Sequence, residues 1–119
     1  MNRLFEKIRN KFSYAFQGLV YGLKNDLSIQ IQYGFAAAAL IACFLFRFEL
    51  QETAIVLAFC AIVISLEYFN SALERMLDDA HPDYSGEIKI IKDLTAGAVL
   101  VASIIALAVG LSFIIRHII

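Results

Sequence analysis

Residues 53–74, TAIVLAFCAIVISLEYFNSALE, run fourteen uncharged residues directly into a stretch of acidic and amide side chains. Such an apolar stretch predicts a helix in a membrane. The fifteen helical steps from Glu52 to Glu67 span only about 22 Å, less than the roughly 30 Å of bilayer hydrocarbon. Glu67 is therefore expected at, or just inside, the boundary of the bilayer. An ionisable side chain at that depth is costly to bury, and this predicts a function for it.

The acidic residues after this boundary form a pattern on one helix face. Glu67, Asn70, Ser71, Glu74 and Asp78 are spaced three or four residues apart, which places them together. Near a membrane these carboxylates need a divalent cation, basic residues or water as partners. Carboxylate oxygens are ligands that suit Mg²⁺. The alternative, a solvated helix end without a site, applies best to Asp78.

The apolar runs on either side predict an all-α integral membrane protein. Hydrophobic residues make up 61% of the chain and charged residues 18%, with a mean hydropathy of +0.73. Soluble domains are about 45–50% apolar. Twenty uncharged residues cover 27–46 and twenty-two cover 94–115, each enough for one span. We therefore predict transmembrane helices at 27–46, 51–70 and 94–115.

The remaining segments complete a single domain, 1–119. Residues 1–26 carry apolar side chains at helical spacing with basic residues off that stripe, which is typical of an amphipathic helix in the membrane interface. Residues 47–52 are expected to form a short polar turn. Within the cytoplasmic segment 71–93, residues 78–93 are expected to be the one substantial loop, whose start could continue the second span as a helix.

Lysine and arginine placement predicts the orientation. Eight of these residues lie before the first span or between the second and third, and two lie on the opposite side. This bias favours a cytoplasmic N-terminus, a cytoplasmic 71–93 segment and an external C-terminus. On the cytoplasmic side, Lys89 and Lys92 could face phosphates, and Asp26 could add a carboxylate.

Two classes of site are disfavoured by composition. The net charge of −1 and the lack of a basic stripe argue against nucleic acid as a partner. A disulfide or a metal site at the cysteines is also disfavoured. Cys43 and Cys60 lie far apart inside apolar runs, and we interpret them as buried thiols.

A family resemblance rests on the motifs already described. The string Glu67-Tyr-Phe-Asn70-Ser-Ala-Leu-Glu74, followed by Asp78 and by Lys92-Asp93-Leu-Thr-Ala-Gly-Ala, resembles the small prokaryotic diacylglycerol kinase family, which includes undecaprenol kinases. The resemblance covers nearly the whole chain. It implies a homotrimeric bundle of three-span subunits in the bacterial cytoplasmic membrane, with active sites shared between neighbours. It also implies transfer of the γ-phosphate of ATP to the hydroxyl of a membrane lipid.

The resemblance further implies roles for individual residues. Glu67 would be the catalytic base, and Glu74 with Asp26 would bind Mg²⁺. Asp26 is one methylene shorter than the glutamate usual in the family. Asn70 and Asp78 would form a supporting polar face. The residues expected to contact ATP are Lys7, Tyr14, Asp26, Glu74, Lys92 and Asp93.

Two questions stay open at this level. A non-enzymatic membrane subunit, whose acidic face binds a cation or a partner, is the alternative to a lipid kinase. The lipid could be diacylglycerol or undecaprenol, and the run Lys92–Val99 is closer to the undecaprenol kinases. The segment 81–89 aligns loosely, so its nucleotide contacts stay open, and we interpret His81 as a loop residue.

Overall fold

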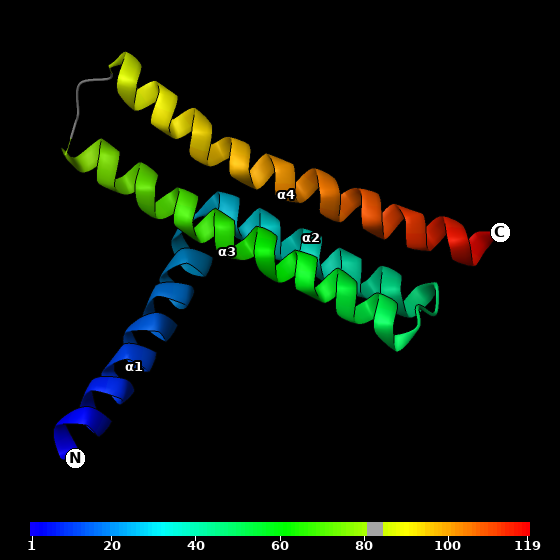
Figure 1. Cartoon of the computed structure of the whole chain (residues 1–119), viewed down its shortest axis with the longest axis horizontal. Helices are drawn as coiled ribbons and strands as arrows, with labels where there is room; N and C mark the ends of the chain where they lie inside the picture. Colours follow the sequence, from blue (N-terminus) through cyan, green and yellow to red (C-terminus); the bar gives the residue numbers. More distant parts are fainter. Residues whose placement is uncertain (81–84) are drawn as a thin grey trace.

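The computed structural model describes residues 1–80 and 85–119, and within those ranges it contains α-helices and no strand (Figure 1). Three of the helices are long and apolar enough to cross a membrane. This confirms the predicted all-α membrane fold. The helices are α1 (Asn2–Asn25), α2 (Leu27–Leu45), α3 (Leu50–Ala80) and α4 (Gly86–Ile118).

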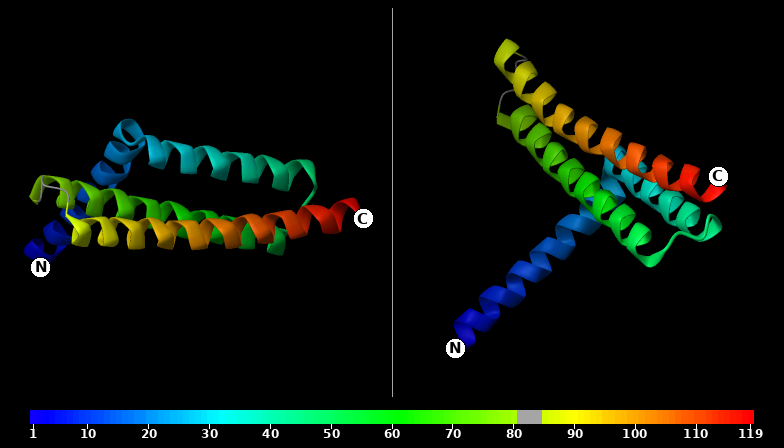
Figure 2. Two further views of the ribbon diagram at one scale, coloured as in Figure 1. Left: turned by 90° about the horizontal axis from the view of Figure 1, so that it is seen from above. Right: turned by 45° about the vertical axis from the view of Figure 1, so that its right-hand side comes forward.

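Helix α3 is the central element of the bundle, because it packs against both α2 and α4. Seen from above, α3 and α4 run side by side while α2 lies over them (Figure 2). An apolar pocket of about 410 Å³, partly open to the outside, lies among these three helices. Most of their large apolar side chains point outward, as a bilayer environment requires.

The two longest helices reach beyond the hydrocarbon. At 31 and 33 residues, α3 and α4 are each roughly 45–50 Å long, against about 30 Å of bilayer core. The loop expected at 78–93 is largely helical in the described residues: residues 78–80 continue α3, as the sequence allowed, and residues 86–93 already belong to α4. The interpretation of His81 concerns residues outside the described ranges.

A capped corner separates α1 from α2. Asp26 has an extended backbone (φ −121°, ψ 113°), and its Oδ1 accepts a hydrogen bond of 3.1 Å from the Ile29 amide. This is the usual N-cap arrangement, which satisfies one of the free amides of the first turn. The Asp26 amide in turn donates to the Gly22 carbonyl at 3.0 Å. The chain thus changes direction here, and α1 leaves the bundle at a steep angle (Figure 1).

The turn between α2 and α3 has the hydrogen bonds of a Schellman motif. The Phe48 amide donates to the Cys43 carbonyl at 2.9 Å, and the Arg47 amide donates to the Phe44 carbonyl at 3.3 Å. Arg47 takes the left-handed position of the motif, with φ 55°. Glycine usually occupies this position because it has no Cβ to clash.

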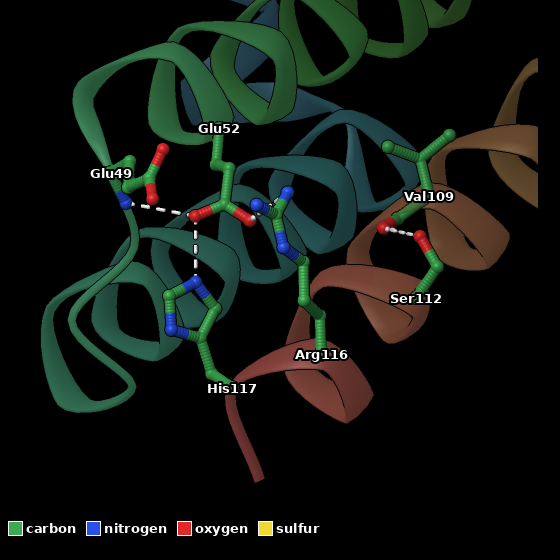
Figure 3. Close-up of polar contacts among 6 residues, drawn as sticks. All are labelled: Glu49, Glu52, Val109, Ser112, Arg116 and His117. Atoms are coloured by element: carbon green, nitrogen blue, oxygen red, sulfur yellow. Dashed lines mark hydrogen bonds and ion pairs between the residues drawn. The ribbon is translucent and has the colours of Figure 1, made fainter. Parts of the chain in front are cut away.

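A cluster of polar side chains joins the end of α4 to the start of α3 (Figure 3). Glu52 was expected in the polar turn, but α3 already begins at Leu50 and Glu52 is only 3% exposed. Its Oε1 accepts from the Glu49 amide at 2.9 Å and lies 2.6 Å from the His117 Nε2. Arg116 approaches Oε2 at 3.7 Å.

Candidate active site

Most of the predicted acidic face lies on the side of α3 that packs against the other helices. We call Glu67, Asn70, Ser71, Glu74 and Asp78 the carboxylate face. Its first three members are 5%, 9% and 8% exposed, in that order. They continue the stripe of buried valines that packs the rest of α3. A carboxylate is thus buried one turn beyond purely apolar packing.

The buried pair at the start of this face has unused hydrogen-bonding capacity. The Asn70 Nδ2 contacts the Glu67 Oε1 at 3.5 Å, at the outer limit of a hydrogen bond. The Asn70 Oδ1 is buried and has no partner among the described residues. A buried acceptor without a donor costs free energy. The Asn70 Oδ1 could therefore accept a hydrogen bond from a further polar group.

The far end of the carboxylate face meets α4. Asp78 is eleven residues beyond Glu67, which is about 20° from the same direction at 100° per residue. Its Oδ1 lies 2.5 Å from the Lys92 Nζ. The neighbouring Asp93 pairs with Lys89 at 2.6 Å on the exposed side of α4. The structure thus brings the acidic motif of α3 and the Lys92-Asp93 motif of α4 to one end of the bundle.

The two predicted metal ligands come from different elements. Glu74 is half-buried and has no hydrogen bond or ion pair with the described residues. Asp26 is half-buried at the corner, where one of its oxygens caps α2. No group of three or more His, Cys, Asp or Glu side chains close enough to hold a metal occurs in residues 1–80 and 85–119. A bound Mg²⁺ would therefore take its other ligands from phosphates and water, as Mg²⁺ commonly does.

The predicted nucleotide residues of α1 lie apart from this end of the bundle. Lys7 and Tyr14 are exposed and lie in the first and middle parts of α1, the helix that projects away from the three long helices (Figure 1). A single chain does not bring them to Glu67.

One residue of the motif has a contact that the sequence analysis did not anticipate. Tyr68 points away from the carboxylate face, and its hydroxyl donates to the Leu19 carbonyl of α1 at 2.7 Å. A second contact between α3 and α1 is a cation–π contact, in which Arg75 lies 4.8 Å from the centre of the Tyr21 ring. The seven-residue spacing of Tyr68 and Arg75 placed both on one stripe of α3, but nothing local indicated that α1 would cover it.

Comparison with known proteins agrees with this arrangement of motifs. The family model for prokaryotic diacylglycerol kinase matches residues 13–114. The chain belongs to this family. The family expected from the sequence motifs is thus confirmed, and the match includes the whole carboxylate face and the Lys92-Asp93 pair. Lys7 lies outside the matched residues.

Two curated relatives carry different kinase names. A diacylglycerol kinase of Synechocystis is 34% identical over 100 residues, which are 83% of this chain and 57% of that protein. An undecaprenol kinase of Bacillus subtilis is 30% identical over 111 residues, which are 93% of this chain and 87% of that protein. The chain thus spans little more than half the length of the Synechocystis relative. No solved structure matches the chain.

Proposed function

We propose that this protein is an ATP-dependent lipid kinase, which transfers the γ-phosphate of ATP to the hydroxyl of a membrane lipid. The observation that carries the proposal is the buried Glu67 and Asn70 pair on α3, a helix apolar enough to cross a membrane, with an acceptor that has no partner among the described residues. Family membership supports the same activity. A lipid alcohol is confined to the interface, so a base for its hydroxyl must be held at that depth.

Glu67 has the position of a general base in this reaction. Its carboxylate would accept the proton of the lipid hydroxyl as the oxygen attacks the γ-phosphate, while Asn70 would accept or donate a hydrogen bond beside it. Phosphoryl transfer depends mainly on positioning and on neutralising charge, and a correctly placed base orients the nucleophile. Glu74 lies seven residues further along α3, roughly 10 Å by helical rise, on the side from which ATP would approach.

The carboxylates available at this end fit a magnesium-dependent reaction. We propose that Glu74 and Asp26 bind Mg²⁺, because each is half-buried and retains oxygens that are not hydrogen-bonded within the chain. The ion would neutralise charge on the phosphates of ATP. Lys92 and Asp93, with Lys7 and Tyr14 from α1, would contact the nucleotide, and Lys92 would exchange its bond to Asp78 for one to a phosphate.

The active site requires a particular orientation and assembly. ATP is cytoplasmic, so the N-terminus and the end of the bundle with the carboxylate face would lie on the cytoplasmic side of the bacterial inner membrane, with the C-terminus outside. We further propose a homotrimer. The exposed N-terminal half of α1 would then reach the site of a neighbouring subunit.

The lipid is proposed to be undecaprenol or diacylglycerol, the substrates named for the two relatives. The coverage of 87% of the Bacillus undecaprenol kinase, against 57% of the Synechocystis protein, favours undecaprenol. An assay of both alcohols with the same preparation would separate them.

The Glu67→Gln variant tests the proposal. Purified protein in lipid nanodiscs, given labelled ATP, Mg²⁺ and either alcohol, should transfer phosphate to lipid. Glu67→Gln keeps the shape and hydrogen bonding of the side chain but cannot take up the proton, and we expect transfer to fall about 10²–10⁴-fold. Asp79→Asn, a matched change on the exposed side of α3, should leave the rate unchanged. A fully active Glu67→Gln variant would refute the assignment of the base.

A further inference from the structure

The interfacial helix α1 contacts α3 at a small junction around Tyr68. The Tyr68 hydroxyl donates to the Leu19 carbonyl of α1 at 2.7 Å. It also lies 3.1 Å from the Tyr33 hydroxyl of α2, and the two rings meet edge to face at 6.4 Å. A phenol has one proton to donate, and a carbonyl can only accept. Tyr33 must therefore be the donor in the second bond, so the Tyr68 hydroxyl links three helices in a defined order.

Gly22 has no side chain and so leaves room for the Tyr68 ring. A Cβ at residue 22 would lie 2.5 Å from the Tyr68 Cε1 and 2.8 Å from the Ile29 Cδ1. Both distances are shorter than carbon atoms tolerate, so α1 can approach α3 this closely only with glycine here. Gly18, one turn earlier on the same helix, has open space around it.

The second contact of the junction limits rotation of α1. Arg75 lies 4.8 Å from the centre of the Tyr21 ring, which is the geometry of a cation–π contact. Both contacts to α3 involve residues 19–22, near the end of α1. The direction of the remainder, including Lys7 and Tyr14, is therefore determined at this junction. Tyr68 follows Glu67 in sequence, so the helix that carries the base also sets this direction.

We infer that Tyr68 is a positioning residue of the kinase, which orients α1 so that its nucleotide-contacting residues are presented at a fixed place relative to the base. The inference rests on the proposed function. In this role Tyr68 acts through α1 and not by contact with either substrate. The Asp26 corner belongs to the same unit, since Asp26 caps Ile29, and Ile29 packs beside Gly22.

Three variants and a matched control test this role in the full-length protein in nanodiscs. Gly22→Ala should displace the Tyr68 ring and raise the KM for ATP by about tenfold, since small misplacements of a binding group are costly. Tyr68→Phe keeps the ring but loses both hydroxyl bonds, and it should raise this KM about fivefold. The value of kcat at saturating ATP should change much less in both. Gly18→Ala makes the same substitution on the same helix and should match the wild type.

Rescue and hydrogen exchange distinguish positioning from general damage. Adding Tyr68→Leu to Gly22→Ala removes the ring that the new methyl meets, so the double variant should bind ATP no worse than Tyr68→Leu alone. Amide exchange over residues 19–25 should accelerate in Gly22→Ala and Tyr68→Phe, but not in Gly18→Ala.

The KM values for ATP and the hydrogen-exchange rates together decide whether the inference holds. Equal KM values for ATP in Gly22→Ala and Gly18→Ala would overturn the inference, as would faster exchange without a change in KM. Wild-type protein that phosphorylates no lipid would overturn the proposed function and this role with it, while the exchange measurement would still report whether the junction forms.

Discussion

At the scale of single residues, two buried glutamates on α3 have opposite surroundings. The Glu52 Oε1 accepts from a backbone amide and lies 2.6 Å from His117, with Arg116 nearby. Within residues 1–80 and 85–119, Glu67 has only the 3.5 Å contact with Asn70. The Glu52 Oε2 has no hydrogen bond among the described residues, but the nearby His117 and Arg116 can balance its charge, whereas Glu67 has no basic partner there and is available for a ligand. Depth alone therefore does not mark the reactive carboxylate.

Loss of the Glu52 charge should weaken the attachment of α4. In Glu52→Gln the amide cannot offer acceptors to both His117 and Arg116, so the thermal unfolding midpoint in detergent should fall by several degrees. Glu49→Gln, three residues earlier and exposed, provides the control and should leave the midpoint unchanged. Phosphate transfer well below the midpoint should persist in both. A midpoint equal to that of the wild type would show that the cluster does not hold the helix end.

At the scale of elements, helix ends determine how the spans connect. The Schellman turn after α2 returns the chain within a few residues, and Phe48 stacks on His117 with ring centres 5.2 Å apart. The N-cap at Asp26 turns α1 out of the bundle at the other end of α2. Both ends use short-range hydrogen bonds, so the hairpin and the corner form from local sequence.

Replacing Arg47 by glycine should stabilise the α2–α3 turn. A non-glycine residue with φ 55° carries strain, and Arg47→Gly should raise the free energy of unfolding by about 1 kcal/mol. Arg47→Ala removes the same side chain but keeps the Cβ, so it should show no gain. Denaturation in mixed micelles measures both. Equal stabilities for the two variants would show that the turn is unstrained.

At the scale of the whole molecule, the isolated chain leaves its amphipathic helix largely without contacts. The large apolar side chains of α1 are exposed, with Phe5 at 70% and Phe16 at 65%. The basic face of the same helix belongs in water, so the membrane interface is the one environment that suits both faces. The residues on α1 predicted to contact ATP are separated from the base of the same chain, and the proposed trimer accounts for this separation.

Mixed subunits should reveal sites shared between chains. Glu67→Gln lacks the base, and Tyr14→Ala lacks the aromatic residue proposed for nucleotide binding. Each homogeneous sample should be weak, but co-expressed subunits should exceed the sum of the two, because some sites then contain both wild-type residues. The molar mass of the protein in nanodiscs or detergent should correspond to three chains. Strictly additive activities would place the whole site within one subunit.

Much of this protein follows from short-range sequence. The lengths of the apolar runs determined the three spans, because hydrocarbon thickness sets how many helical residues cross it. The three- and four-residue spacing determined which side chains share the carboxylate face, since helical periodicity is local. The motifs of α3 and α4 also identified the family.

Only the tertiary structure decided which faces meet. The pairing of Glu52 with His117 joins residues 65 apart, and the fit of Tyr68 against Gly22 joins two helices that lie far apart in the sequence. Such contacts depend on the angle and rotation at which helices pack, and no single segment contains that information. A tyrosine after the base and a glycine in an amphipathic helix look ordinary in sequence. Their fit is visible only in the folded chain, where α1 and α3 approach so closely that a methyl group at residue 22 would clash with the Tyr68 ring.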